Sequence, residues 1–409
     1  MIETDIAIVG AGLAGASLAC ALAGHGLRIA LIEATAVSAD APADAHADGT
    51  DRAIALALGS QRIFATLGLW DAIAAHAGPI RRIHVSDRGH FGAARLDARD
   101  MNVEALGYVV PARALGNELL RAASALPEVS LFAPASVQAL ALHADHAGLS
   151  ITTRAGTDQI SARLVVGADG AASTVRSLAD IPTTERRYDS AALVARVTTG
   201  RAHEATAWER FTPHGPIALL PVRDGKLSLV WTLPPADAKR MLELDEPAFV
   251  AQLQHAFGNR LGRFLDVSGR RIYPLSQLLA DDAQRQRLAL IGNAAHVVHP
   301  VAGQGFNLGL RDVAVLAEKI AHAAQTGQDV GAQSLLDEYA RARQRDHFMV
   351  RGFTHGLISI FANDLPFAGP ARGLGLAVVD LIPPVKRALL RRTMGLAGPL
   401  PRLARGLSL

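Results

Sequence analysis

The sequence predicts an α/β fold in which a doubly wound domain, discontinuous along the chain, is interleaved with a mainly antiparallel β-sheet and followed by a C-terminal helical segment. Three apolar strands that each run into a glycine-rich turn, at residues 6–10, 164–170 and 287–292, indicate the doubly wound part. Short apolar runs bounded by Gly, Pro, Asp and Asn indicate the antiparallel part. With 409 residues, of which 50% are hydrophobic, the chain can bury a core large enough for two or three domains.

Composition and charge exclude several classes of protein. The single cysteine, Cys20, excludes a disulfide framework and agrees with a reducing cytoplasm. The opening residues, MIETDIAIVGAG, lack the basic start of a secretory signal, and no run of about twenty apolar residues predicts a spanning helix. A formal net charge of +3 without basic, aromatic-rich stretches argues against nucleic acid. No His, Cys and carboxylate cluster has metal-ligand spacing, so we expect a cytoplasmic protein without a metal.

The first glycine-rich turn has the pattern of a dinucleotide-binding site. A buried strand at 6–9 precedes a G-x-G-x-x-G turn and an alanine-rich helix, with glycines at Gly10, Gly12 and Gly15. The first glycine makes the tight turn, the second lets the backbone approach a pyrophosphate, and the third lets helix and strand pack closely. A second strand at 28–32 ends in Glu33, which is placed to accept hydrogen bonds from ribose hydroxyls. This motif alone does not separate FAD from NAD.

Two later segments repeat the strand-to-turn pattern. LVVGADGAASTVR, residues 164 to 176, is an apolar strand that ends in Asp169 and Gly170. RLALIGNAAHVVHPVAGQGFNLGLRD, residues 287 to 312, places two histidines, a proline and several glycines directly before a helix. Glycines let the backbone come into contact with a flat ring, and a helix N-terminus stabilises negative charge.

Together the three segments resemble the fingerprint, DG and GD motifs of the single-component FAD aromatic hydroxylases, in the same order and spacing. The GD segment, DRAIALALGSQRIFATLGLWD at 51–71 and GYVVPARALGNELL at 107–120 are most similar to the ubiquinone-biosynthesis hydroxylases, in particular the 2-octaprenyl-6-methoxyphenol hydroxylases. The resemblance extends from residue 1 to about 350. It implies a Rossmann-like FAD-binding domain, with NAD(P)H as the electron donor.

The resemblance also implies which residues contact FAD. Arg52 and, more weakly, Arg113 would reach its phosphates or ribose, although both can also be solvated surface arginines. The other implied contacts are Gly292 and Asn293 at the ribitol and Gly303, Gly305, Phe306 and Asn307 at the pyrimidine edge. Asn293 departs from the family, in which aspartate is usual at this place. Because asparagine still accepts from a hydroxyl, we expect FAD binding to survive.

By the same resemblance, reduced flavin and dioxygen form a C4a-hydroperoxide whose distal oxygen is transferred to an electron-rich phenol. Pro300 would lie beside the reactive edge of the ring. His296 and His299 are candidates for the base that takes the phenol proton, but a packing or hydrogen-bonding role is at least as common for such histidines.

The motifs divide the chain into three parts. We expect the FAD-binding domain at 1–75, 110–180 and 281–345, the substrate-binding sheet at 76–109 and 181–280, and a basic helical tail at 346–409. Expected strands of the sheet are 81–85, 192–198, 207–211, 217–221 and 227–233.

The tail from Leu381, LIPPVKRALLRRTMGLAGPLPRLARGLSL, carries six cations and no acid. Leucines alternate with the cations at helical spacing, as in helices that lie on anionic membranes. A basic helix packed on the FAD-binding domain is an equally good interpretation, and four prolines limit any helix to a short piece.

The function predicted from this resemblance is FAD- and NAD(P)H-dependent hydroxylation of a polyprenyl phenol by molecular oxygen in ubiquinone biosynthesis. The partners expected for this protein, besides the substrate and oxygen, are a membrane surface and other ubiquinone-biosynthesis proteins. Two alternatives stay open: the same chemistry on a small soluble aromatic, and a catalytically quiet FAD-bound scaffold of a biosynthetic complex.

Overall fold

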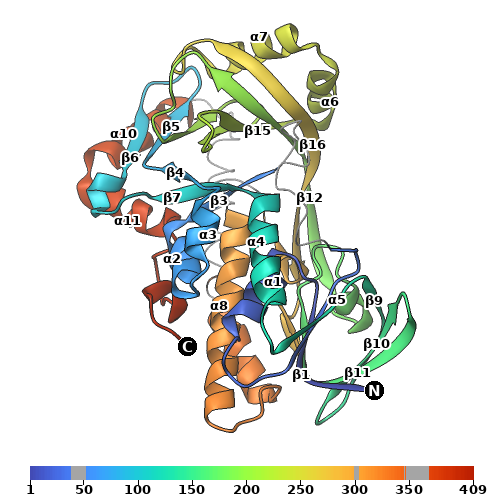
Figure 1. Ribbon diagram of the computed structural model, residues 1–409. Coiled ribbons are helices and arrows are strands. Elements are labelled where there is room, and N and C mark those ends of the chain that lie inside the picture. Colours follow the sequence, from blue (N-terminus) through green and yellow to red (C-terminus); the bar gives the residue numbers. More distant parts are fainter. Residues whose placement is uncertain (38–51, 299–303, 345, 347–367) are drawn as a thin grey trace.

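The computed structural model describes residues 1–37, 52–298, 304–344, 346 and 368–409. Two eight-stranded sheets occupy opposite ends of the molecule (Figure 1), and a three-stranded sheet lies in the middle. The α/β class and the presence of C-terminal helices are confirmed.

The first large sheet, sheet A, contains the fingerprint strand and has the order β17-β18-β11-β1-β2-β8, with β10 and β9 continuing from β11. Its strands are β1 (Ile2–Val9), β2 (Ile29–Ile32), β8 (Val129–Phe132), β9 (Ala135–Leu142), β10 (Ala147–Thr153), β11 (Gly156–Gly167), β17 (Gln284–Arg285) and β18 (Leu288–Leu290). β1 runs parallel to both β2 and β11. Side chains alternate along β1, so Ile6 and Ile8 pack toward the helices while Ala7 and Val9 pack toward the β9–β10 hairpin.

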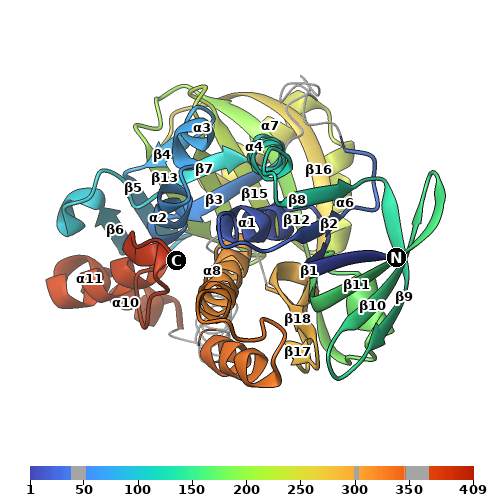
Figure 2. The ribbon, with the colours of Figure 1, turned by 60° about the horizontal axis from the view of Figure 1, so that its bottom comes forward.

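Three helices cover the first of these faces (Figure 2): α1 (Leu13–Ala21), α4 (Ala112–Ser124) and α8 (Gln304–Gln325). The short α5 (Thr174–Leu178) packs on the other face beside the hairpin. Because β1 ends at Gly10 and α1 starts directly afterward, the helix is fixed close over the strand that precedes it.

The second large sheet, sheet C, has the order β19-β16-β12-β15-β14-β13-β5-β6. Its strands are β5 (Arg82–Asp87), β6 (Ala93–Asp97), β12 (Thr183–Thr199), β13 (Thr206–Phe211), β14 (Ile217–Pro221), β15 (Leu227–Leu233), β16 (Phe264–Ala280) and β19 (His296–Val297). All neighbours are antiparallel except β13 and β5. One face packs on α6 (Pro235–Glu243) and α7 (Glu246–Phe257).

Two of the expected strands, 217–221 and 227–233, have the bounds that the sequence predicted. The expectation that the strands are short was wrong for β12 and missed β16, since each has 17 residues. Both extend past β15, which pairs with β12 only over residues 191–197, since Thr183 of β12 still pairs with Ala280 of β16. Figure 1 shows them running between the two ends of the molecule, so they hold sheets A and C together.

The middle of the molecule is a small sheet of β3 (Ala53–Ala57), β7 (Gly107–Pro111) and β4 (Gly78–Ile80), with α2 (Leu58–Thr66) and α3 (Trp70–Ala74) beside it. All strands of sheet A fall within the segments expected for the FAD-binding domain, and all of sheet C except β19 falls within those expected for the substrate sheet. β7 crosses the expected boundary at residue 110.

The C-terminal segment forms α10 (Ala368–Leu381), α11 (Pro383–Thr393) and the 3-10 turn η4 (Leu403–Arg405). Leu390 and Leu403 are buried, which for these two leucines favours packing on the protein over contact with a membrane. The Gly59 N–H donates to the Met394 carbonyl at 2.8 Å, which joins the tail to α2. The tail is therefore packed into the protein along much of its length.

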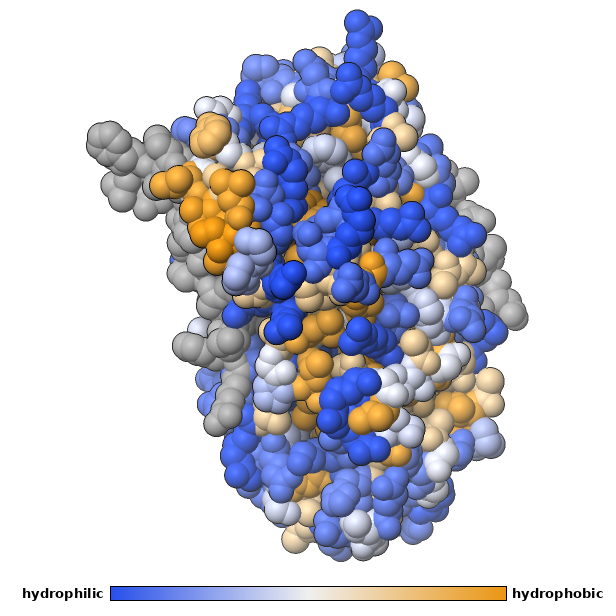
Figure 3. All heavy atoms as spheres, turned by 90° about the vertical axis from the view of Figure 1, so that its left-hand side faces the viewer, coloured by the Kyte–Doolittle hydropathy of each residue, from blue (hydrophilic) through white to orange (hydrophobic). Residues whose placement is uncertain are grey.

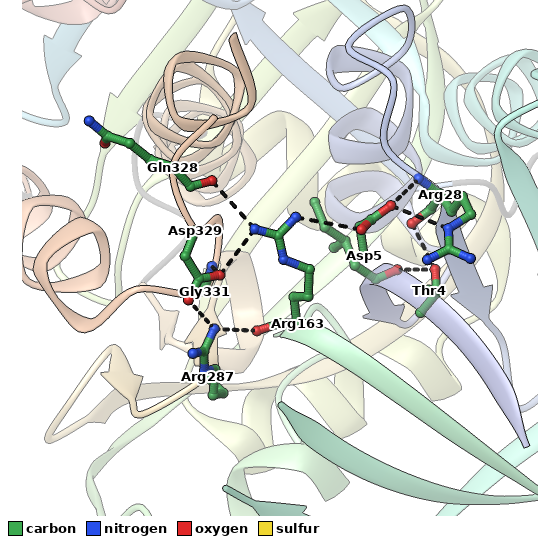
Figure 4. A network of polar contacts seen from close by, with 9 residues as sticks. Thr4, Asp5, Arg28, Arg163, Arg287, Gln328, Asp329 and Gly331 are labelled. Carbon is green, nitrogen blue, oxygen red and sulfur yellow. Dashed lines mark hydrogen bonds and ion pairs between the residues drawn. The ribbon is translucent and has the colours of Figure 1, made fainter. Parts of the chain in front are cut away.

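A polar network joins β1, β11 and the segment after α8 (Figure 4). Arg287 donates to Asp329 at 2.5 Å, and Arg163 reaches both Asp329, at 3.3 Å, and Asp5, at 3.6 Å. These contacts fix the end of α8 against sheet A. Among the helices of the described ranges, none has the length and apolar character needed to cross a bilayer.

Candidate active site

A cavity of about 1470 Å³ lies between the two large sheets. This volume exceeds the roughly 300–1,000 Å³ typical of a pocket for one ligand, so two ligands can lie side by side. One half, which we call the nucleotide half, is lined by Gly10, Gly12, Glu33, Arg52, Asp169, Gly170, Gly292, Asn293 and the first turn of α8. The other, the sheet half, is lined by the free face of sheet C and by α10 and α11.

The fingerprint turn builds the first wall of the nucleotide half. Gly10 has φ +101°, and a Cβ there would lie 2.6 Å from the Ala168 carbonyl oxygen. At Gly15 a Cβ would lie 1.9 Å from the Gly10 carbonyl oxygen, which is the close packing of helix and strand that the motif predicts. A Cβ at Gly12, in contrast, would meet nothing within 4 Å and would enter the cavity.

Glu33 follows β2 at the same edge of sheet A. Its carboxylate accepts from the Ala11 N–H at 2.9 Å and from the Thr35 N–H at 3.0 Å, so its direction is fixed. Arg52 also lines this half, whereas Arg113 on α4 is not among the lining residues. A phosphate contact is therefore supported for Arg52 and not for Arg113.

The DG segment is held by its own aspartate. Asp169 accepts from Ser173 Oγ at 2.5 Å and from the Val175 N–H at 3.0 Å, which fixes the turn that carries Gly170. Arg176 is buried and donates to the carbonyls of Ala294 and Ala171, both at 2.8 Å. Arg176 thus connects the DG and GD turns and keeps both at the cavity.

The GD turn is held by an aspartate from α8. Asp312, which is fully buried, accepts from the Gly292 N–H at 3.0 Å and from His296 Nε2 at 2.6 Å. Its other oxygen accepts from Arg343 Nε at 2.6 Å. Asn293 is exposed to the cavity, but His296 is 2% exposed and is not a lining residue. This position favours a structural role for His296 over contact with a substrate.

The N-terminus of α8 borders the same half, with Gly305, Phe306 and Asn307 in its wall. The Asn307 side chain accepts from the Ala57 N–H at 2.8 Å and donates to the Ala55 carbonyl at 2.8 Å, so it fixes β3 against α8. The Phe306 ring stacks on Phe64. Three predicted site residues, His299, Pro300 and Gly303, lie outside the residues that the structure describes.

The sheet half is mainly apolar. Side chains from β5, β6, β12, β13, β14 and β15 line it, among them Val85, Leu96, Val194, Leu220 and Val230. The inner faces of α10 and α11 close the side with Leu376, Val379 and Leu389. Glu209 on β13 is an acid within this apolar wall.

Sequence reasoning did not single out Asp312, Arg343 or Glu209. The only local signal for Asp312 is its place at the end of the glycine-rich GD segment, and Arg343 lies far from it along the chain. The available signal for Glu209 was a pair of charged residues within the predicted strand at 207–211.

These residues fit FAD. The N-termini of α1 and α8 face one cavity, which suits a pyrophosphate and an electron-rich ring edge respectively. The open space at Gly12 is where a phosphate needs close backbone approach, and Glu33 lies at the end of β2 where ribose hydroxyls bind.

Comparison with known proteins agrees with this geometry. Residues 3–349 match the family model described as FAD binding domain. Ubiquinone hydroxylase UbiL of Rhodospirillum rubrum is 40% identical over 99% of this chain and 93% of its own length. 3-Demethoxyubiquinol 3-hydroxylase of Escherichia coli is 34% identical over 96% and 99% respectively. The solved structure of p-nitrophenol 4-monooxygenase PnpA from Pseudomonas putida covers 97% of this chain and 99% of its own with a TM-score of 0.80, at 20% identity.

Fold and site thus define a flavoprotein with a two-part cavity. The chain belongs to the FAD-binding-domain family, among its FAD-dependent monooxygenases.

Proposed function

We propose that this protein hydroxylates a polyprenylated phenol, of the 2-polyprenyl-6-methoxyphenol type, in ubiquinone biosynthesis. The observation that carries the proposal is the continuity of the nucleotide half with a large apolar half in one cavity. The names of the relatives, which are ubiquinone hydroxylases, support the substrate class.

The nucleotide half then binds FAD and the sheet half binds the substrate. Bound FAD supplies the redox chemistry, since it takes two electrons from NAD(P)H and activates dioxygen for transfer of one oxygen atom. Gly12 and the α1 N-terminus hold the pyrophosphate, and the α8 N-terminus faces the electron-rich ring edge. The sheet half binds the aromatic ring and prenyl chain and keeps water away from the reacting atoms.

The apolar lining favours a prenylated ring over a small soluble aromatic. A small ring leaves most of the wall unoccupied, while each buried CH₂ of a prenyl chain contributes about 0.8 kcal/mol. The test is hydroxylation of methoxyphenols with zero, one, two and three prenyl units by the FAD-loaded protein, measured as product by mass spectrometry. We expect kcat/KM to rise with chain length. Equal kcat/KM for all four would favour the soluble aromatic. No NAD(P)H consumption with or without any of the phenols would favour the quiet scaffold.

The same substrate supports contact with a membrane surface. On α10 an apolar row, Leu374, Val378 and Leu381, is 62%, 39% and 77% exposed. The row continues with Ile382, between the two helices, and with Val385 of α11. Figure 3, which faces the side that carries both helices, shows apolar atoms gathered there. Because the opposite face of α10 lines the sheet half, this row lies next to the cavity.

Exposed Arg387 and Arg391 on α11 add positive charge beside the row, which suits anionic lipid. We expect Leu374→Glu with Leu381→Glu to abolish flotation with anionic vesicles while FAD stays bound. Leu265→Glu, at a 59% exposed position on β16, is the matched control and should float as the native protein does. Undiminished flotation of the double variant would contradict membrane contact through α10.

A further inference from the structure

The cavity face of sheet C presents one acid in an apolar row. Strand register places Val85 of β5 and Ala218 of β14 on either side of Glu209. The row continues through Ala218 to Val230 and from Val230 to Val194. All five residues line the cavity, and Glu209 alone carries a polar side chain.

The orientation of Glu209 follows from alternation along β13. Its neighbour Trp208 packs on the other face of the sheet, with its ring 4.7 Å from His84 and 6.4 Å from Phe257. Ala207 and Phe211, two residues away from Glu209 on each side, line the cavity as Glu209 does. The carboxylate therefore enters the sheet half from its wall.

Within the described part of the chain, the Glu209 carboxylate makes no hydrogen bond or ion pair with another residue. Other titratable groups that line the cavity are Glu33, Arg52, Asp169, Tyr273 and Arg372. Of these, Arg372 comes from α10 and donates to Asp87 of β5 at 2.8 Å. A polar group held in an apolar wall without a protein partner costs free energy, so a ligand group is the natural partner.

We propose that Glu209 is the catalytic residue that accepts the phenol proton of the substrate. This inference rests on the proposed function and adds to it the group that orients and activates the ring. A carboxylate accepts a strong hydrogen bond from a hydroxyl, and a phenol that loses its proton becomes a better nucleophile at the para carbon. The acid would also fix which end of the substrate faces the cofactor.

The ionisation of Glu209 suits this task. Burial raises the pKa of the Glu209 carboxyl to about 7. An ordinary carboxylate is a much weaker base, and a general base is most useful when its pKa is close to the working pH. Activity that depends on ionised Glu209 therefore rises with pH through about 7.

The proton transfers balance over one turnover. Overall, one oxygen atom of O₂ is inserted into the ring C–H bond, and the other is reduced to water by the hydride of NAD(P)H, which supplies two electrons and one hydrogen, together with one proton from solvent. Glu209 takes the O–H proton as the ring carbon bonds to the incoming oxygen, which leaves a ring ketone. It returns that proton to the same oxygen when the carbon loses its hydrogen to solvent and the ring becomes aromatic again. Glu209 ends as it began.

The first test measures binding, without turnover. Flavin fluorescence of the full-length FAD-loaded protein would report the Kd of a short-chain prenylated methoxyphenol and of its O-methyl ether, which has no hydroxyl proton. Above pH 7 we expect the native protein to bind the phenol at least about tenfold more tightly than the ether. Glu209→Leu should bind the two equally. Glu243→Gln, at an exposed position on α6, is the control and should discriminate as the native protein does.

The second test measures proton acceptance. Glutamine keeps a hydrogen-bond acceptor but not a base, so Glu209→Gln should bind phenol and lose hydroxylation by about 100-fold. NAD(P)H oxidation should continue and yield hydrogen peroxide, and the remaining rate should no longer rise with pH near 7. Glu209→Asp should recover part of the rate.

The outcomes separate the two proposals. If native protein hydroxylates the phenol while Glu209→Leu still discriminates phenol from ether, or Glu209→Gln keeps the native rate and pH profile, Glu209 is not the proton acceptor and the proposed function stands. If native protein hydroxylates no phenol but its discrimination is lost in Glu209→Leu, the binding site stands and the hydroxylase function fails. Native protein that binds phenol and ether equally overturns the role of Glu209.

Discussion

The Asp312 carboxylate accepts a 2.6 Å hydrogen bond from His296 Nε2 and, through the same oxygen, a 3.0 Å hydrogen bond from the Gly292 N–H. One buried side chain of α8 thereby holds the turn that carries Gly292 and Asn293 at the cavity. Its charge is matched by Arg343, of which 1% is exposed.

Asp312→Asn should destabilise the protein, because it removes the fully buried one of the two carboxylates that pair with the buried Arg343 guanidinium and leaves only Asp346. Leaving a buried charge with no partner costs about 3–5 kcal/mol, and the remaining pair with Asp346 keeps the cost below that range. We expect a lower Tm and reduced FAD occupancy, measured by thermal unfolding and by flavin absorbance of the purified protein. Adding Arg343→Met to Asp312→Asn should recover part of the stability. A single variant with native Tm and native FAD content would show that this network does not hold the turn.

The two glycines of the fingerprint should respond differently to valine. Gly12→Val places its side chain in open cavity space, so we expect a folded protein that loses FAD. Gly15→Val drives its Cβ into the Gly10 carbonyl, so we expect loss of folding itself. Circular dichroism and flavin content of the two variants check the contrast. If the Gly12→Val protein still binds FAD fully, the pyrophosphate does not occupy the space beside Gly12.

These glycines also mark what the sequence could predict. A G-x-G-x-x-G turn is specified by local backbone demands, so its place after β1 follows from the residues themselves. The bounds of β14 and β15 were predictable because each is a short apolar run with turn residues on both sides.

The position of Glu209, in contrast, depends on the parallel pairing of β13 with β5, which nothing in the local sequence shows. The same is true of Arg343, which reaches Asp312 only because the segment after α8 turns back along it. His296 looked like a candidate base because its partner could not be seen from the sequence.

Asp329 should stabilise the fold in a pH-dependent way. Burial alone would raise the pKa of Asp329, but hydrogen bonds from the Gly331 N–H and from Arg287 outweigh it, so the pKa is lowered. A lowered pKa means that the stabilisation is present above the unfolded-state pKa of about 4 and is lost as pH falls through the folded-state value. Asp329→Asn should cost about 1 kcal/mol at pH 7, a modest figure because Asp329 is 36% exposed.

Urea unfolding of native protein and Asp329→Asn at pH 7, 5 and the lowest pH that permits folding checks this dependence. The difference should shrink below about pH 4. Asp282→Asn removes a nearby but 51% exposed ion pair with Arg285 and should cost close to nothing. If the difference in the free energy of unfolding between native protein and Asp329→Asn grows as pH falls, the ionised Asp329 carboxylate does not stabilise the fold.

The effect of Glu209 on the pH dependence of stability should be opposite to that of Asp329, because the pKa of Glu209 is raised and that of Asp329 is lowered. Since burial raises its pKa from 4.5 to about 7, its stabilising protonated form is lost as pH rises through 7. Glu209→Gln should therefore be more stable than the native protein at pH 8, by about 2 kcal/mol, and equally stable at pH 4.5. Thermal unfolding of both proteins without substrate measures the difference. Equal Tm values at pH 8 would mean that the carboxylate is well solvated in the cavity.

Removal of the tail should damage the fold before it affects any membrane contact. A chain that ends before Leu381 loses Leu390 and Met394, which are buried in one apolar cluster with Leu58. Each such buried side chain contributes about 1.5–3 kcal/mol to stability. It also loses Leu389 and Thr393, which line the cavity. We expect the truncated chain to have a Tm many degrees lower and to retain little FAD.

Surface substitutions separate this structural role from a lipid contact. Arg387→Ala with Arg391→Ala removes two exposed cations of α11 and no buried side chain, so Tm and FAD content should be native. If these arginines face anionic lipid, each contributes about 1 kcal/mol at low salt, and vesicle binding should fall by about tenfold or more. A truncated chain with native stability would show that the buried leucines of the tail contribute little. Native vesicle binding by the double variant would place any lipid contact on the apolar row of α10 alone.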